Sequence, residues 1–369
     1  MAKRTLIIGG YGNFGSFIAN KLAPDSNIQL IIAGRNEEKA KELASNLKAA
    51  NKAEYAVLDI NKNLSGSLTK IKPDIVIHTS GPYQGQGYHV AKLCIKQGCH
   101  YIDLADARDF VSGISQLDKK AKEKAVFICS GASSVPCLTS AIIDHYKPHF
   151  KKLEKIDYAI STAQLTNRGL ATTSAALSYA GKPFKTLIDG KMQDVHGWTD
   201  LKCHKFWKLG SRLLGRADTP DLELFPKRYP DLKTINFYGG LEIKLLQFLL
   251  FLSSWLVRIK LMPTLLPFAK IMLKSSFIFD SIGTGNSGFY MQLFGKCNKD
   301  VEKELAFEIV AKDGDGAFIP TMPAIIIARK LASNKIRKKG ATPCIGIITL
   351  DEYLKEFDGL NIKWHDKVN

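Results

Sequence analysis

The stretch "GGYGNFG", at residues 9–15, follows the apolar run "TLII" (5–8) and leads into an amphipathic stretch, so it joins a predicted strand to a predicted helix. Gly10, Gly12 and Gly15 have the spacing G-x-G-x-x-G. In this setting the first glycine permits a tight turn, the second lets the backbone approach a pyrophosphate, and the third lets the helix pack closely on the strand. The stretch therefore predicts a dinucleotide-binding domain, with phosphates held at the helix N-terminus by free amides and the helix dipole.

The first 130 residues repeat this strand–helix alternation. Strands are predicted at 5–9, 29–33, 54–58, 75–79, 101–104 and 125–129, and helices at 14–22, 37–50, 88–97 and 113–123, with an irregular turn at 64–71. Such alternation is typical of a parallel sheet with helices on both faces. We predict the α/β class, with an N-terminal doubly wound Rossmann domain at residues 1–135.

The pattern changes in the second half of the chain. Strands are predicted at 153–162, 234–237, 288–295 and 302–311 (the last two as antiparallel neighbours), apolar helices within 241–274, a loop-rich region at 216–233, a long helix within 314–332 and a short helix at 348–357. We predict a second, α+β domain at residues 136–330, with a mixed or antiparallel sheet and apolar helices. A C-terminal segment, 331–369, is expected to pack back on the first domain.

The second predicted strand ends at Gly34-Arg35, within "LIIAGRNEEKA" (30–40). NAD-binding units carry an Asp or Glu there for the ribose hydroxyls. Without that carboxylate the space is open, and the Arg35 guanidinium can bond a 2′-phosphate in bidentate fashion, which favours NADP(H) over NAD(H). The alternative is a solvated Arg35 at the start of a helix that Asn36 caps. Asp59, which ends the third strand, either contacts the adenine amine or serves as a turn residue.

Composition narrows the class of protein. A net charge of +17 is compatible with an anionic cofactor, nucleic acid or phospholipid. No helix-turn-helix, aromatic RNA-binding signature or zinc motif is present, so we expect no nucleic acid. The seven cysteines are scattered without metal-ligand spacing, which indicates free thiols in a reducing compartment and no metal site. The N-terminal apolar run is too short for a signal peptide, so a cytoplasmic protein is expected.

One apolar segment, "LLQFLLFLSSWLV" (245–257), lies between Lys244 and Arg258. It is too short to span a hydrocarbon core about 30 Å thick, which requires about 20 residues. A buried core helix or an oligomer interface is the first interpretation. A membrane-surface element with basic flanks is the second.

Five stretches occur in a recognisable order: "GGYGNFG" (9–15), "AGR" (33–35), "TSGPYQGQG" (79–87), "YIDLADA" (101–107) and "SGASSVPCL" (130–138). Together they resemble the saccharopine dehydrogenase-like (saccharopine reductase-like) NADP-binding oxidoreductase family. "GLATTSAALSYAGKPF" (169–184) and "DGDGAF" (313–318) are weaker similarities.

The resemblance implies a Rossmann domain followed by an α+β domain. It also implies NADP(H), with Gly81-Pro82-Tyr83 near the ribose–nicotinamide end of the cofactor. Many relatives carry Gly-Glu after the fifth strand, where this chain has Ala105-Asp106-Ala107-Arg108. That difference leaves the substrate open.

The motifs and the resemblance together define the candidate site. Tyr83 and Asp106 are the candidate catalytic residues, although Tyr83 could instead wall the nicotinamide pocket and Asp106 could pair with Arg108. The predicted cofactor-binding residues are Gly10, Gly12, Asn13, Phe14, Gly15, Arg35, Asn36, Asp59, Ser80, Gly81, Pro82, Tyr83 and Asp103.

We therefore predict an NADP(H)-dependent oxidoreductase with a small-molecule substrate, either an imine or amino-acid-derived compound or a lipid-like enoyl compound. The alternative is a non-catalytic NADP(H)-binding protein that acts at a membrane surface or with a protein partner. A homodimer is expected, and residues 241–274 are the candidate for peripheral membrane contact.

Overall fold

The chain forms two compact units in the computed structural model, which describes residues 1–166, 168–298 and 300–368. The first unit comprises Met1–Ala141 and Phe318–Glu356, and the second comprises Ile142–Ala317 and Phe357–Asn369. The chain thus returns to each unit once. These divisions fall at other residues than the boundaries proposed from the sequence at 135 and 330.

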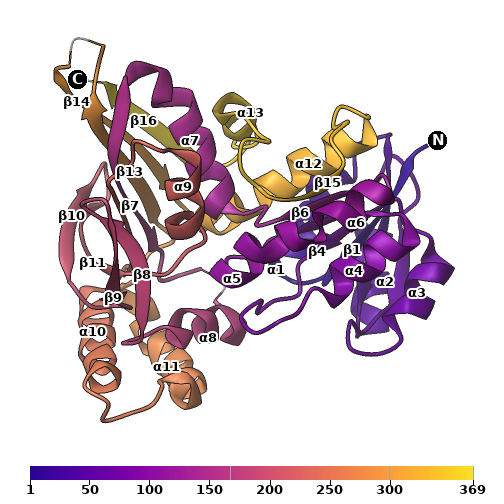
Figure 1. Cartoon of the computed structure of the whole chain (residues 1–369). Coiled ribbons are helices and arrows are strands. Elements are labelled where there is room, and N and C mark those ends of the chain that lie inside the picture. The colour runs from indigo at the N-terminus through magenta and orange to yellow at the C-terminus, as the bar shows by residue number, and fades with distance from the viewer. Residues whose placement is uncertain (167, 299, 369) are drawn as a thin grey trace. The chain divides into compact units, whose positions relative to one another are not determined.

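The first unit is built on a seven-stranded sheet of order β15-β6-β5-β4-β1-β2-β3 (Figure 1). All neighbouring pairs are parallel. The order 3-2-1-4-5-6 within it is that of the doubly wound dinucleotide-binding fold, so the predicted fold class is confirmed. The strands are β1 (Lys3–Ile8), β2 (Ile28–Gly34), β3 (Glu54–Val57), β4 (Ile75–His78), β5 (His100–Asp103), β6 (Phe127–Ser130) and β15 (Gly340–Pro343).

Helices surround this sheet. They are α1 (Asn13–Leu22), α2 (Glu37–Asn46), α3 (Leu64–Ile71), α4 (His89–Gln97), α5 (Arg108–Ser112), η1 (Gly113–Leu117), α6 (Asp118–Glu123), η2 (Ser134–Leu138), η6 (Asp315–Thr321), α12 (Met322–Ala332) and α13 (Leu350–Lys355). The expected irregular turn at 64–71 was wrong, because α3 buries Leu64 and Leu68 one turn apart. The helix predicted at 37–50 ends at Asn46.

Burial on both faces explains the apolar runs that the sequence shows in these strands. Leu6, Ile7 and Ile8 of β1 are at most 2% exposed, since helices pack above and below them. Residues 318–356 complete the unit: α12 packs against α1, where the Arg329 guanidinium donates to the Lys21 carbonyl at 2.8 Å. The last part of the segment expected to pack on the first domain, Phe357–Asn369, belongs to the second unit. The strand β15, which no sequence pattern indicated, extends the sheet beyond β6.

The second unit has a seven-stranded mixed sheet of order β10-β11-β12-β7-β13-β14-β16 and a separate hairpin, β8-β9. Among the described strand pairs of this sheet, only β12 and β7 are parallel, and β13 and β14 are antiparallel neighbours as predicted. The strands are β7 (Lys152–Thr162), β8 (Pro183–Ile188), β9 (Lys191–His196), β10 (Lys202–Phe206), β11 (Gly210–Arg216), β12 (Thr234–Leu241), β13 (Ser287–Lys296), β14 (Glu302–Ala311) and β16 (Ile362–Val368).

Two helices of the second unit, α10 (Lys244–Arg258) and α11 (Ala269–Ser276), carry many of its exposed apolar residues. The short helices η4 (Leu266–Phe268) and η5 (Phe277–Ile282) flank α11 in the sequence. The others are α7 (Thr139–Tyr146), which carries the chain in from the first unit, η3 (Lys147–His149), α8 (Leu170–Ser178) and α9 (Asp221–Arg228). The expected loop region at 216–233 therefore contains a helix. Acidic residues in the first turn of α9 and basic residues in its last turn complement its dipole, and Leu222 and Phe225 are buried.

Candidate functional site

The glycine loop and the loop after β4 meet at the carboxyl edge of the first unit's parallel sheet. The amides of Gly9 and Gly10 both donate to the Ala33 carbonyl, at 2.9 and 3.0 Å. The Thr79 hydroxyl donates to the Ile8 carbonyl at 2.9 Å, which ties the end of β4 to the end of β1. Ligands of doubly wound sheets bind at this edge.

The three glycines of the motif are required for different reasons. A Cβ on Gly15 would lie 2.3 Å from the Gly9 carbonyl oxygen, and a Cβ on Gly10 would lie 2.9 Å from the Ile7 carbonyl oxygen. Both are thus excluded by the protein's own backbone. A Cβ on Gly12 would meet only the Gly9 carbonyl oxygen, at 3.2 Å, so the space beside Gly12 is open to a ligand.

Within the described residues, the N-terminus of α1 has no side-chain cap. Its N-cap, Gly12, offers no side-chain hydrogen bond, and its first turn has no acidic residue. The first amides of a helix have no intrahelical acceptor, and the dipole there favours an anion. This arrangement, with the open space at Gly12, fits the pyrophosphate of a dinucleotide.

Arg35 and Asn36 lie between β2 and α2. The Asn36 side chain accepts from the Lys39 amide at 2.9 Å, so Asn36 is the N-cap of α2. Arg35 is exposed and, within the described part of the chain, forms no ion pair. Glu37 and Glu38 occupy the first turn of α2, so Arg35 is the cationic residue immediately before two acidic ones at this corner.

In the loop after β4, Gly81 and Pro82 are exposed, Ser80 is half-buried and Tyr83 is buried. The Tyr83 hydroxyl donates to the His78 carbonyl at 2.7 Å, and the ring is only 5% exposed. Burial raises the pKa of this phenol well above its usual value, so it stays protonated at neutral pH. His78 is a core residue whose Nδ1 lies 3.0 Å from the Tyr101 hydroxyl.

Asp103 ends β5 and is fully buried. Its Oδ1 accepts from the Ala105 amide, the Ser130 hydroxyl and the Gly131 amide, at 3.0, 3.0 and 2.9 Å. Burial raises the pKa of the Asp103 carboxyl to about 6, although these donors oppose the shift. In this geometry the carboxyl holds the loops after β5 and β6.

Asp106 and Asp59 are nearer to solvent. The exposed Asp106 carboxyl accepts from the Gln84 side-chain amide at 3.3 Å. The Asp59 carboxyl accepts from the Asn61 amide at 2.9 Å, the bond of a local turn. The predicted residues after β1 to β5 thus lie along one edge of one sheet.

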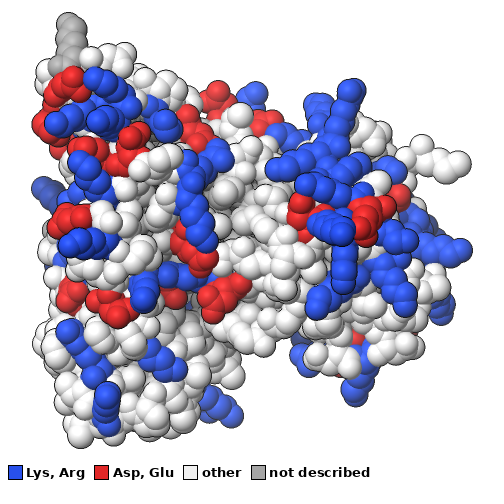
Figure 2. All heavy atoms as spheres, viewed as in Figure 1, with Lys and Arg blue, Asp and Glu red and all other residues white. Residues whose placement is uncertain are grey.

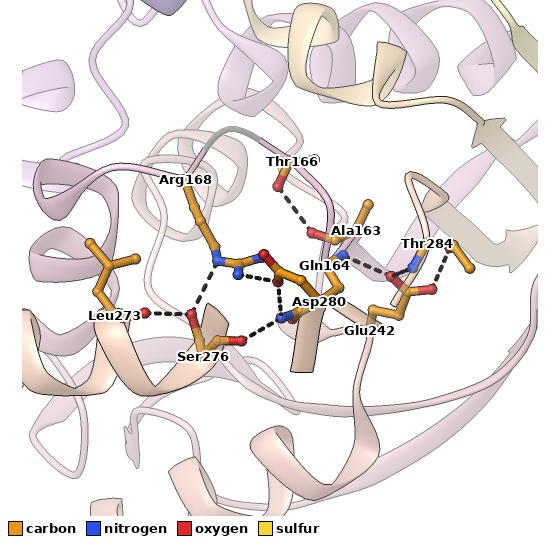
Figure 3. A network of polar contacts seen from close by, with 9 residues as sticks. All are labelled: Ala163, Gln164, Thr166, Arg168, Glu242, Leu273, Ser276, Asp280 and Thr284. Atoms are coloured by element: carbon orange, nitrogen blue, oxygen red, sulfur yellow. Dashed lines mark hydrogen bonds and ion pairs between the residues drawn. The ribbon is translucent and has the colours of Figure 1, made fainter. Parts of the chain in front are cut away.

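A separate polar network lies in the second unit (Figure 3). Glu242 accepts from the amides of Gln164 and Thr284, at 2.7 and 2.9 Å, and forms an ion pair of 3.1 Å with Arg212, each side chain being 8% exposed. Arg168 pairs with Asp280, which also accepts from the Gln164 side chain at 2.8 Å. Each charge is matched by another, which is typical of a structural network.

The helices α10 and α11, with the turns beside them, carry an exposed apolar surface. We define this apolar surface by its exposed residues: Leu245, Phe248, Leu249, Leu252, Trp255, Leu256, Ile259, Leu261, Leu266, Phe268, Ile271, Phe277, Ile278 and Ile282. In Figure 2 the region of α10 and α11 is largely white, with blue side chains in it. Within the described residues, no helix has the length and apolarity needed to cross a membrane.

The polarity of α10 is inverted relative to a helix on a water-facing surface. Gln247 and Ser254 are fully buried, whereas leucines, Phe248 and Trp255 are exposed. Gln247 Oε1 accepts from the Leu241 amide at 3.0 Å and Ser254 donates to the Leu250 carbonyl at 2.8 Å, whereas the buried Gln247 Nε2 has no hydrogen-bond partner within the described residues. The segment is therefore a half-exposed helix and not a fully buried core helix.

The strand order, the glycine loop and the uncapped helix α1 define the first unit as a dinucleotide-binding domain of the Rossmann class. Residues 5–129 match the family model of the saccharopine dehydrogenase NADP-binding domain. This domain is thus similar to the NADP-binding domain of saccharopine dehydrogenases, as its motifs indicated, and its cofactor is NADP(H).

Curated relatives match over a limited part of their length. A saccharopine dehydrogenase-like oxidoreductase of Rattus norvegicus is 29% identical over 150 residues, which are 36% of this chain and 34% of the rat protein. A lipid droplet localized protein of Caenorhabditis elegans is 25% identical over 142 residues, 36% of this chain and 33% of that protein. The matches therefore span about a third of these relatives.

The fold extends the similarity to the whole chain. Apo saccharopine dehydrogenase (L-Glu forming) from Saccharomyces cerevisiae superposes with a TM-score of 0.71 at 14% identity, covering 99% of this chain and 100% of that chain. This likeness shows that the second unit, too, has the architecture found in that enzyme.

Sequence reasoning did not single out Tyr11 and Thr79, which contact the ends of β1 and β2. An aromatic residue inside the glycine loop was the available signal for Tyr11. The sequence contains no comparable signal for Thr79, because a hydroxyl residue at the end of a strand is common.

Proposed function

We propose that the protein is an NADP(H)-dependent oxidoreductase that acts on a small molecule. The names of the mammalian relatives support an oxidoreductase. The observation that carries the proposal is the glycine loop, in which the space at Gly12 and the uncapped N-terminus of α1 are left for a pyrophosphate. When bound, NADP(H) would supply hydride transfer.

The chain's own residues would bind and orient the cofactor. The loop of residues 10–15 would hold the pyrophosphate, and Arg35 would pair with the 2′-phosphate. The segment of residues 80–83 would lie near the nicotinamide ribose. We propose that Tyr83 shapes this segment through its bond to the His78 carbonyl, and that Asp103 fixes the neighbouring loops.

Asp106 is our candidate for contact with the substrate. Asp106 lies at the same sheet edge, and its carboxyl accepts from the neutral side-chain amide of Gln84. Desolvation raises the pKa of this carboxyl, so a cation or N–H donor of the substrate would stabilise its charged form. An imine or amino-acid-derived substrate would bring a cation or N–H donor for it. A lipid-like enoyl substrate would not use it, so an Asp106→Asn variant separates the two classes.

The test has two parts. Titration of nicotinamide fluorescence should give an NADPH Kd at least about tenfold below that of NADH, as expected for charge-assisted bonds to the 2′-phosphate. NADPH consumption should then occur with a panel of amino acids and keto acids, which form imines, or with a panel of enoyl thioesters. Binding without turnover in either panel would favour the non-catalytic alternative.

We also propose that the apolar surface docks on an anionic lipid surface. Residues 243–279 contain no Asp or Glu, while Lys244, Arg258, Lys260, Lys270 and Lys274 accompany the exposed apolar side chains. An apolar face with only basic companions is typical of an interfacial helix. The name of the C. elegans relative agrees with a location on lipid. The homodimer and the cytoplasmic location stay predictions.

A further inference from the structure

The ring of Tyr11 lies over the end of β2. A Cβ on Gly34 would be 2.3 Å from Cε1 of Tyr11 and 2.8 Å from its hydroxyl oxygen. That hydroxyl accepts a hydrogen bond from the Asn36 amide at 2.9 Å. Tyr11 thus bridges the glycine loop to the corner where Arg35 lies, and glycine at 34 leaves room for its ring.

We propose that Tyr11 closes the adenosine subsite of the free protein and must move when NADP(H) binds. Its ring covers Gly34, where an adenosine ribose has to approach. Its hydroxyl takes the amide at the N-terminus of α2, a donor that a 2′-phosphate oxygen could use beside Arg35. Tyr11 is therefore a residue that sets cofactor affinity, and the inference rests on NADP(H) as the cofactor.

The consequence is a defined effect on affinity. A ligand that binds only the open form has an apparent Kd equal to its intrinsic Kd divided by the fraction of the protein that is open. Because NADPH and NADH both carry the adenosine ribose, the bond to Asn36 should weaken both by the same factor. Discrimination between them should depend on Arg35 and stay unchanged.

Two substitutions separate this role from packing of the ring on bound adenine. Tyr11→Phe keeps the ring and removes the acceptor of the Asn36 amide. Tyr11→Ala removes both. If the ring supports the bound cofactor, only the alanine variant should weaken binding.

The experiment is a fluorescence titration with NADPH and NADH, and calorimetry with adenosine 2′,5′-bisphosphate, which fills only the adenosine half of the site. Tyr11→Phe should lower the Kd of all three by about two- to tenfold, the range for loss of one hydrogen bond. Amide hydrogen exchange of Asn36 should be faster in the free variant. Tyr55→Phe, at an exposed tyrosine of β3, is the matched control and should change nothing.

An unchanged or higher Kd for Tyr11→Phe, with unchanged exchange at Asn36, would overturn the inference. If no substrate were turned over, the proposed oxidoreductase activity would be wrong. The inference about Tyr11 would not be affected, because it is tested by cofactor binding and amide exchange.

Discussion

A Cβ added to Gly15 would lie 2.3 Å from the carbonyl oxygen of Gly9, a separation that no real pair of these atoms can have. Gly15 is therefore a requirement of the fold, since α1 could not otherwise begin against the loop. A Cβ on Gly12, in the same motif, would make one close contact, 3.2 Å to the Gly9 carbonyl oxygen. We therefore expect glycine at position 12 to be needed for binding of the cofactor and not for folding.

Substitution of these two glycines should separate folding from binding. Gly15→Ala should lower the free energy of unfolding by about 2 kcal/mol or more, because backbone must shift to relieve the overlap. Gly12→Ala should change it by less than about 1 kcal/mol, yet raise the NADPH Kd about tenfold by intruding on the pyrophosphate. Urea unfolding and fluorescence titration measure the two effects. Equal losses of stability would contradict the distinction.

Arg35→Ala should raise the NADPH Kd by about tenfold or more and change the NADH Kd by less than about twofold, because only the 2′-phosphate loses a charge-assisted partner. Arg35→Lys should fall between, since an ammonium cannot form the bidentate bond. Lys41→Ala, at an exposed cation of α2, is the control. A parallel loss for both cofactors would show that Arg35 does not contact the 2′-phosphate.

Asp103 should make stability depend on pH. Its folded pKa, about 6, lies above the ordinary value of 3.8, so its favourable contribution is complete at low pH and is lost as pH rises through about 6. The loss amounts to roughly 3 kcal/mol at most. Asp103→Asn keeps an acceptor for the Ser130 and Gly131 donors and does not ionise.

The variant should therefore gain stability relative to the unmodified protein between about pH 4 and pH 7, when both are unfolded with urea at each pH. A difference in unfolding free energy that is constant with pH would show that the carboxyl titrates normally.

Glu242→Gln should lower the free energy of unfolding by about 3–5 kcal/mol, because it leaves the buried Arg212 guanidinium without a counter-charge. Glu154→Gln is the matched control: its partner Lys233 has a side chain 62% exposed, and the loss should be below about 1 kcal/mol. Similar losses for both variants in urea unfolding would mean that the Glu242–Arg212 pair is as solvated as the Glu154–Lys233 pair.

The apolar surface should be responsible for binding to vesicles. The double variant Phe248→Ser, Leu252→Ser should reduce flotation with phosphatidylserine-containing vesicles by about tenfold or more, since two side chains worth about 1.5–3 kcal/mol each no longer enter lipid. Met192→Ser, also exposed in the second unit, is the control. Neutral phosphatidylcholine vesicles should bind less than anionic ones. Unchanged flotation of the double variant would exclude this surface.

Features that depend on residues close together in the sequence could be predicted, and features that depend on contacts between distant segments could not. The strand–helix alternation, the glycine spacing and Gly34-Arg35 are local patterns, and they sufficed for the first unit's fold and its cofactor. The polar strands β10 and β11 carried no apolar alternation and were missed. The strand β15 was missed for another reason: Gly340 and Ala341 become a strand only because β6 offers an open edge.

Two features of the site depended on the folded chain. Tyr11 reaches Asn36 across 25 positions of sequence, and Asp103 receives donors from Ser130 and Gly131 beyond it. Side-chain contacts of this kind depend on which loops a sheet brings to one edge. The same holds for α10, whose apolar residues were plain in the sequence, while the face that remains exposed was decided by the strands and helices that cover Gln247 and Ser254. Short-range spacing thus specified the cofactor-binding motif, and only packing between distant segments decided what surrounds it, because burial is a property of the assembled chain.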